Sequence, residues 1–430
     1  MRTLRRLAGL ILCGYLAWTV PVAADAVADW NIIAVGAVSA GRPGAPGGVD
    51  LALIQAAVHD AVQAIEGRFQ PYHVKISGAP GSPAAAVAAA AYGVLVGCYP
   101  AQAGSLTTTY QSYLTSNNLV NDPGLAVGKL VADTILPLRR VDPSPLPPPF
   151  KGGTKPGEWR PTESFIGTPP LPPSFAPMLA PWLGSFKPFT LKSPTQYRAP
   201  KPPVLHSARY AQDYDEVKAL GARFNSARTA EQTDLAYFYS GNFLAMLNLG
   251  LRDIAAQQGL NIGESARLLA LANLANADAV ITAWDSKLHY NFWRPITAIR
   301  EGDNDTNAHT AGDSTWQPLI NTPNYPDYTS GANNVTGATT RTLALFFGTD
   351  NMTFALKTAV PQAVQKTRTY TRFSDAAQDV VDVRIYEGIH FRAADEAARK
   401  QGRQVAKWVF KNFLRPIGEH GSNDGNDGDD

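Results

Sequence analysis

The sequence predicts an all-α protein, and three observations lead to that class. Long runs rich in alanine and leucine contain neither glycine nor proline, which is typical of buried helices. Residues that favour helix starts precede several of these runs. No stretch of useful length alternates apolar and polar residues, as a half-buried strand would.

The first helical part is expected between residues 25 and 141. Residues 51–65 are apolar on most faces and predict a buried helix. The alanine-rich run 84–95 and the run 125–136 predict two more helices.

A proline-rich segment, residues 142–207, separates this part from the next. Its prolines exclude regular helix and sheet. Its aromatic content argues against a disordered linker, and we expect an ordered loop that wraps over the helices. The aromatic residues are Trp159, Phe165, Phe175, Trp182, Phe186 and Phe189.

Helices are expected to resume at Ala208 and to build a second part over residues 208–420. Thr229 and its neighbours predict one helix start, and Ser374-Asp375 can cap a helix that runs to about Tyr386. Residues 302–328 form a polar loop. The strongest helical runs are 264–285, 336–347, which ends at Gly348, and 391–413.

The two ends of the chain have a different character. Residues 1–24 combine three arginines, a short apolar run and the small residues of a cleavage site, which predicts a signal peptide and a secreted or periplasmic protein. The alternative is an N-terminal membrane anchor, but the run is shorter than the ~20 residues of a spanning helix. We expect no stable membrane insertion after cleavage. The tail, residues 421–430, predicts disorder.

Charge and cysteine content exclude several functions. The 430-residue chain has a formal charge of +2, and loss of the three N-terminal arginines would leave −1. This balance gives no electrostatic basis for binding nucleic acid. Cleavage would leave Cys98 as the single cysteine, which argues against disulfides, thiol chemistry and zinc clusters.

Three clusters in the second part carry chemistry. Lys287 and Arg294 are seven residues apart, and on one helix they would share a face. Two cations on one face repel each other unless an anion lies between them. The alternative is a solvated face, but the neighbouring residues are aromatic, an environment that usually excludes unpaired charge. These neighbours are Trp284, Tyr290, Phe292 and Trp293.

The other two clusters supply further anion ligands. Ser330 and Gly331 precede the helix expected near Thr336, where a hydroxyl and free amides suit an oxyanion, although such a pair is more often a plain cap. Arg384 and His390 would diverge on a continuous helix, and Gly388 between them can break it. A histidine alone is usually a core residue. Together the clusters form a set that would hold a tetrahedral oxyanion, phosphate or vanadate.

The order and spacing of these residues resemble the vanadium-dependent haloperoxidases and the type 2 phosphatidic acid phosphatase superfamily. That signature is Lys-x6-Arg-Pro, then Pro-Ser-Gly-His, then Arg-x5-His. This chain has Lys287 to Arg294-Pro295, then Thr329-Ser330-Gly331-Ala332, then Arg384 to His390. The matched motifs lie within about residues 270–400, and the run 51–65 is similar to the N-terminal part of that family's helical body. The resemblance implies two packed helical bundles of the vanadium chloroperoxidase type.

The resemblance also implies roles for individual residues. Vanadate, with phosphate as a competing occupant, would be bound by Lys287, Arg294, Ser330, the Gly331 amide and Arg384. His390 would be the axial metal ligand, as neutral imidazole. The implied substrates are hydrogen peroxide, a halide and an organic acceptor, with Lys287 polarising the bound peroxide. Trp284 and Tyr325 occupy positions that line the halide pocket in the chloroperoxidase branch.

The chain departs from the signature where the acid–base histidine should be, because Ala332 stands there and Thr329 replaces the proline. Loss of an acid–base group typically costs ~10²–10⁴-fold in rate. Asn333, Asp327, His289 and His309 are the substitutes that the sequence offers, and nothing in the sequence chooses among them.

Three functions therefore stay open at this point. The first is a haloperoxidase-like enzyme with reduced activity. The second is a soluble acid phosphatase that forms a phosphohistidine at His390. The third is a non-catalytic oxyanion-binding protein. The motif flanks favour the haloperoxidase branch, and a homo-oligomer is compatible with all three.

Overall fold

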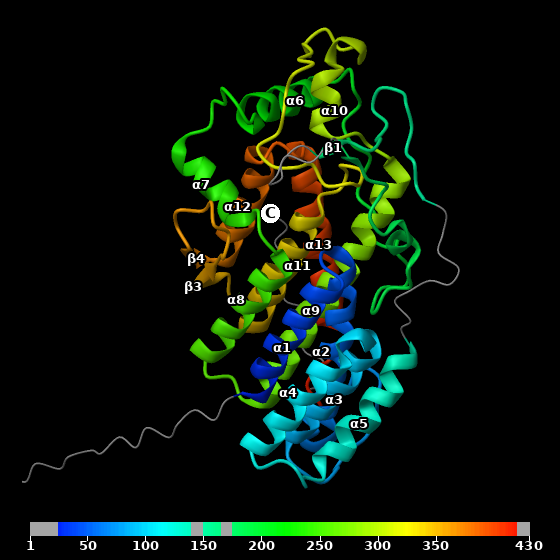
Figure 1. Cartoon of the computed structure of the whole chain (residues 1–430), viewed down its shortest axis with the longest axis vertical. Helices are drawn as coiled ribbons and strands as arrows, with labels where there is room; N and C mark the ends of the chain where they lie inside the picture. Colours follow the sequence, from blue (N-terminus) through cyan, green and yellow to red (C-terminus); the bar gives the residue numbers. More distant parts are fainter. Residues whose placement is uncertain (1–24, 139–148, 165–173, 419–430) are drawn as a thin grey trace, which may run out of the picture.

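The computed structural model describes residues 25–138, 149–164 and 174–418, and helices dominate this part of the chain (Figure 1). The prediction of an all-α protein is thus confirmed. The expected signal peptide and acidic tail lie outside the described residues.

The N-terminal helices form one bundle, drawn in blue and cyan in Figure 1. Helix α3 packs against its neighbours in this bundle, and α2 packs on both α3 and the later helix α9. Nearly every residue of α2 is buried, which explains its lack of a polar face. The bundle consists of α1 (Ala26–Gly41), α2 (Ala45–Glu66), α3 (Pro83–Cys98), α4 (Ala103–Ser116) and α5 (Gly124–Ile135), with 3-10 turns at Pro100–Gln102 and Leu136–Leu138.

The C-terminal helices are organised around α9, a 29-residue helix. Asn261 and Glu264 form a capping box at its start. Helices α11 and α13 pack on α9 and on each other, and α12 packs on both α11 and α13. The helices are α6 (Ala208–Gly221), α7 (Ala230–Tyr239), α8 (Phe243–Gln257), α9 (Ile262–Tyr290), α10 (Pro295–Arg300), α11 (Gly331–Phe347), α12 (Phe373–Tyr386) and α13 (Arg392–Asn412), with 3-10 turns at Pro181–Ser185 and Gly302–Asn304.

Two glycines let α11 and α13 approach closely. A Cβ atom at Gly402 would lie 2.1 Å from the Asn334 carbonyl oxygen, and one at Gly337 would lie 2.6 Å from the Arg399 carbonyl oxygen. Any side chain at either position would therefore push the helices apart. The close crossing brings the first turn of α11 next to the first turn of α13.

The proline-rich segment is anchored to the C-terminal helices in its described parts. The buried Asp278 carboxylate on α9 accepts hydrogen bonds from the amides of Phe189, Thr190 and Leu191. Arg198 makes two hydrogen bonds of 2.7 Å to Asp285, about two turns further along α9. Two short antiparallel strands, β1 (Glu163–Ser164) and β2 (Ser174–Phe175), also lie in the segment, so the expectation that its prolines exclude sheet is wrong for these residues.

Several expected boundaries are wrong. An antiparallel hairpin, β3 (Asn351–Lys357) and β4 (Thr367–Arg372), was not predicted, although Met352, Phe354 and Leu356 alternate with polar or small residues along β3. The expectation that no stretch of the chain alternates is therefore wrong for β3. Helix α11 begins at Gly331 and not near Thr336. Four whole helices, α1, α4, α8 and α10, were not predicted.

No single helix among the described residues is long and apolar enough to cross a membrane. One bent helix pair, Pro83–Cys98 with Pro100–Ser116, passes by length and composition alone.

Candidate oxyanion site

Lys287 and Arg294 reach the same buried site from opposite sides of a helix break. Helix α9 ends at Tyr290, Asn291 adopts a left-handed φ of 46°, and Arg294 is the N-cap of α10. The prediction that one helix face carries both cations is therefore wrong. Both side chains are fully buried. The two side chains therefore meet because the chain changes direction at Asn291, and not because they share a helix face.

The loop before α11 holds both cations by its carbonyl groups. Lys287 Nζ donates to the Pro326 oxygen at 2.7 Å and to the Asp327 oxygen at 3.0 Å. Arg294 Nε donates to the Tyr325 oxygen at 2.8 Å. Because carbonyl groups carry no net charge, these contacts orient the two cations without neutralising them.

An aromatic wall borders the cations. The Tyr325 ring lies 4.7 Å from Lys287 Nζ and 4.8 Å from Arg294 Cζ, and its centroid is 4.9 Å from that of Trp284. Such rings favour a nearby cation and exclude water. The structure thus places Trp284 and Tyr325 at the site.

Ser330 and Gly331 occupy the start of α11. Ser330 is the N-cap, its side chain caps no helix amide, and Gly331 is the first helical residue. The first amides of a helix have no acceptor within it, and they attract anions. Ala332 is partly exposed beside them. This helix start can therefore bind an oxyanion with one hydroxyl and with backbone N–H groups.

Arg384 and His390 converge because the chain turns between them. Helix α12 ends at Tyr386, and Gly388 adopts a φ of 78°, as expected for a helix break. Arg294 Nη1 then donates to the Ile389 carbonyl at 2.6 Å and lies 3.1 Å from His390 Nε2. The side chains of Lys287 and Arg384 are near enough to lower the pKa of His390.

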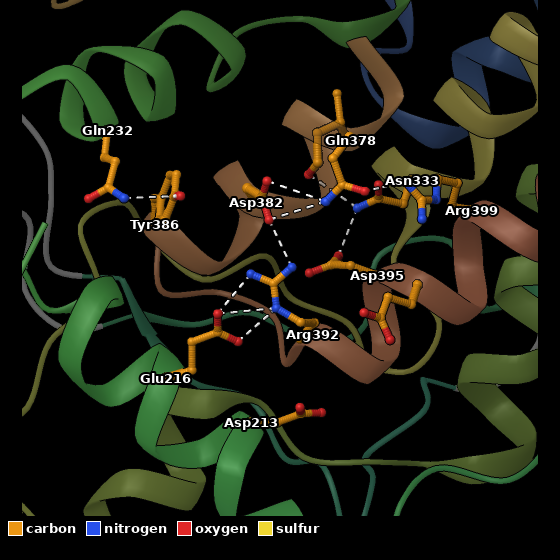
Figure 2. Close-up of polar contacts among 12 residues, drawn as sticks. Asp213, Glu216, Gln232, Asn333, Gln378, Asp382, Tyr386, Arg392, Asp395 and Arg399 are labelled. Carbon is orange, nitrogen blue, oxygen red and sulfur yellow. Dashed lines mark hydrogen bonds and ion pairs between the residues drawn. The ribbon is translucent and has the colours of Figure 1, made fainter. Parts of the chain in front are cut away.

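A polar clamp fixes the His390 turn from its other side (Figure 2). Arg392 donates to Glu216 on α6 at 2.7 to 3.1 Å and to Asp382 on α12 at 2.8 Å. The Ala393 amide donates to Asp213 on α6 at 2.9 Å. The clamp joins α6, α12 and α13 around the loop that carries His390.

Asp327 determines which nitrogen of His390 is free. Its Oδ1 lies 2.7 Å from His390 Nδ1, and both side chains are buried. Burial first, and then Arg294, Lys287 and Arg384, lower the pKa of His390 well below its usual value, so the imidazole is neutral. A neutral imidazole that donates Nδ1–H to a carboxylate keeps its lone pair on Nε2.

Three buried carboxyl groups face the three cations. Glu387 Oε2 lies 2.6 Å from Arg384 Nη1, and Asp327 Oδ1 lies 3.8 Å from Arg294 Nη1. Asp395 at the start of α13 is fully buried and accepts a hydrogen bond of 2.8 Å from Asn333. The site is therefore close to charge balance when all six groups are ionised.

Burial works against that ionised state. It raises the pKa of both Asp327 and Glu387 to about 7, although neighbouring cations lower it, and it raises the pKa of Asp395 well above the usual range. Burial, followed by Arg294, lowers the pKa of Lys287 well below its usual value. Protonated carboxyls would leave the site with surplus positive charge.

Several buried polar atoms of the site have no hydrogen-bond partner among the described residues. The donors are Arg294 Nη2 and Arg384 Nε, and the acceptors include Asp327 Oδ2, Asp395 Oδ2, Asn333 Oδ1 and Glu387 Oε1. Buried polar atoms are normally satisfied. The two unsatisfied guanidinium groups fit an oxyanion, whose oxygens would accept from both.

The structure also sorts the residues that could replace the acid–base histidine. His289 and His309 are exposed and do not reach the site. Asn333 and Asp327 do reach it. Sequence reasoning missed Glu387 and Asp395, although their positions, three residues after Arg384 and five after His390, could have drawn attention to them.

Comparison with known proteins gives the family of this region. The model of the VCPO second helical-bundle domain matches residues 267–419. The vanadium chloroperoxidase of Curvularia inaequalis is 34% identical over 93 residues, which is 19% of this chain. The match spans only 15% of that relative.

Solved structures share the fold over most of the chain. A bacterial vanadium-dependent iodoperoxidase superposes with a TM-score of 0.75 at 23% identity, covering 91% of this chain and 98% of its own. The apo and holo forms of a bacterial vanadium-dependent chloroperoxidase superpose with a TM-score of 0.68 at 17% and 16% identity. They cover 84% and 90% of this chain, and 91% and 92% of their own.

Proposed function

Because the chain belongs to the vanadium haloperoxidase and type 2 phosphatidic acid phosphatase superfamily, we propose that it binds vanadate and uses hydrogen peroxide to oxidise a halide, with slow turnover. The unsatisfied guanidinium nitrogens of Arg294 and Arg384 carry this proposal. They lie buried beside a neutral imidazole, and this combination of donors fits an oxyanion that also accepts one nitrogen ligand.

Residues of this chain would hold the anion in defined ways. Lys287, Arg294 and Arg384 would donate to its oxygens, with Ser330 and the Gly331 amide. His390 Nε2 would be the metal ligand, once Arg294 Nη1 turns from it to the anion, with Asp327 holding the proton on Nδ1. Bound vanadate would supply a Lewis-acidic centre that activates peroxide toward halide.

Ala332 is the reason to propose slow turnover. Its methyl group carries no proton, so it cannot accept the one that peroxide loses or return it to a leaving oxygen. The anion shell loses only one hydrogen-bond partner by this change. Binding should therefore be preserved better than catalysis.

A phosphatase is the second candidate, and the Asp327–His390 contact favours it. An imidazole held with its proton on Nδ1 presents Nε2 as a nucleophile, which could attack phosphorus and expel an alcohol. The same cations would bind the phosphate oxygens. A non-catalytic oxyanion-binding protein is the third candidate, and Ala332 is the observation that favours it.

One experiment separates these functions. Protein purified without phosphate is analysed for vanadium and assayed for iodide and bromide oxidation with and without added vanadate, and for hydrolysis of p-nitrophenyl phosphate. Vanadate-dependent halide oxidation that disappears in His390→Ala supports the proposal. Phosphate ester hydrolysis alone would favour the phosphatase, and binding without turnover would favour the third candidate.

Export is part of this proposal, because residues 1–24 have the character of a signal peptide. The exported protein would begin near Asp25. Mass spectrometry of secreted or periplasmic material tests this, and retention of Arg2, Arg5 and Arg6 would contradict it.

A further inference from the structure

The start of α13 places a buried carboxyl next to the anion-binding serine. Figure 2 shows Asp395 on α13 and Asn333 on α11 facing each other across the helix crossing. Asn333 Nδ2 donates to Asp395 Oδ1 at 2.8 Å and lies 3.4 Å from Ser330 Oγ. One amide group thus holds Asp395 and Ser330 side by side, and the serine hydroxyl is close enough to lower the pKa of Asp395.

The free oxygen of Asp395 is the structural reason to assign it a proton. Oδ2 is buried and has no hydrogen-bond partner in the described part of the chain, whereas Oδ1 is satisfied by Asn333. A buried carboxylate oxygen without a donor is strongly disfavoured, but a protonated one can donate to a neighbour. Ser330 Oγ is the neighbour that lies at the anion site.

The charged groups around Asp395 act in both directions. Asp327 on the loop before α11 raises its pKa, and Arg384 on α12 lowers it. Lys287 on α9 and Arg294 before α10 also interact with it electrostatically. Burial has the largest effect and raises the pKa of Asp395 well above its usual range, which favours the neutral form.

We propose that Asp395 is a positioning residue that, as a neutral acid, donates its Oδ2 proton to Ser330 Oγ and so directs the single Ser330 hydroxyl proton toward the bound oxyanion. This inference rests on the proposed oxyanion binding. A hydroxyl has one proton. If Asp395 is ionised, Ser330 donates to Asp395 and turns a lone pair toward the anion, which weakens binding.

The proposal predicts a specific pH dependence of oxyanion affinity. The neutral acid is present at low pH and is lost as pH rises through the raised pKa of Asp395, so affinity falls with rising pH. Ionisation of Asp327 and Glu387 and deprotonation of Lys287 weaken binding in the same direction. A variant that removes only the Asp395 contribution is therefore needed.

Asp395→Asn is that variant, because an amide can donate to Ser330 at every pH. Tungstate is the probe, since this tetrahedral anion carries no titrating proton between about pH 6 and about pH 9. Affinity is measured by calorimetry for wild type, Asp395→Asn, Ser330→Ala and the double variant. Asp375→Asn, at an exposed position of α12, removes the same charge as a control.

We expect wild-type affinity to fall about tenfold more than that of Asp395→Asn between the two pH limits, the size of one hydrogen bond to a charged group. Asp375→Asn should follow the wild type. In the Ser330→Ala background, Asp395→Asn should leave the pH slope unchanged, because the effect passes through the hydroxyl.

Three results would overturn the inference. They are equal pH slopes for wild type and Asp395→Asn, an Asp395→Asn effect that persists without the Ser330 hydroxyl, and affinity that is lower in Asp395→Asn at every pH. If Asp395→Asn does not fold, Ser330→Ala decides alone, since its slope must be shallower than that of the wild type. A wild type that binds neither tungstate nor vanadate would overturn the proposed function itself.

Discussion

Asp278 and Lys287 lie on the same helix, α9, and both are buried, but their surroundings differ in kind. Asp278 accepts hydrogen bonds from three backbone amides of the proline-rich segment and from the Thr190 hydroxyl. Around Lys287, by contrast, guanidinium and carboxyl atoms remain without partners within the described structure. The Asp278 carboxylate receives all its hydrogen bonds from the chain, whereas Lys287 lies among groups whose missing hydrogen-bond partners a ligand could supply.

This difference separates anchoring from binding. Buried polar atoms are costly unless they are paired, so an anchor is selected for complete pairing. A binding site must keep donors unpaired until the ligand arrives. The completeness of hydrogen bonding, rather than burial or charge, distinguishes the two regions of α9.

Replacing Asp278 by alanine tests the anchoring role of this residue and should have the largest effect of the substitutions considered. Three amides and one hydroxyl would lose their acceptor, which should lower the free energy of unfolding by about 4 kcal/mol. Chemical denaturation measures this. Asp133→Asn, at an exposed ion pair with Lys129, is the control and should change stability by less than ~1 kcal/mol. Equal effects in the two variants would show that Asp278 is no anchor.

Ala332→His tests whether the oxyanion site near Lys287 lacks only a proton carrier. An imidazole at the partly exposed start of α11 would restore a proton carrier beside the anion, and vanadate-dependent bromide oxidation should rise by about 10²-fold. Initial rates at saturating vanadate without phosphate measure this. Ala332→Gln, which has similar bulk but no titrating group, is the matched control. A histidine variant no faster than the wild type would mean that another residue already serves as the acid.

Glu387→Gln tests whether burial of the ionised Glu387 carboxylate destabilises the folded protein. Burial raises the pKa of Glu387 to about 7, above its value in an unfolded chain. Such a carboxyl contributes stability at low pH and loses it as pH rises through about 7. The variant should therefore match the wild type near pH 5 and exceed it near pH 8 by on the order of 2 kcal/mol. Unfolding curves of ligand-free protein at the two pH values decide, and a variant that is less stable at pH 8 would contradict the expectation.

The helical class and the residues that gather at the candidate site could be predicted from the sequence, because each depends on local patterns. The apolar composition of runs such as 51–65 indicates a buried helix. Gly388 indicates a helix break because glycine readily adopts a positive φ. The three motifs likewise named Lys287, Arg294 and His390 before any geometry was known.

What could not be predicted depends on contacts between distant segments. The helix end at Asn291, which places Lys287 and Arg294 in two different elements, uses a left-handed residue that need not be glycine. Asp395 lies at the site only because α11 and α13 cross closely. The hairpin β3–β4 is a different case, because the alternation of Met352, Phe354 and Leu356 along β3 is a local signal that was overlooked.

The glycine pair at the crossing of α11 and α13 also links ligand binding to folding. Ser330 and Asp395 become neighbours only when Gly337 and Gly402 have docked, since any partial separation of the helices parts them. An oxyanion that needs both helix starts can bind only the docked state, and it stabilises that state by mass action. Amide hydrogens along the crossing should then exchange more slowly as oxyanion concentration rises, while those of the largely exposed helix α4, which can exchange by local opening, should change little.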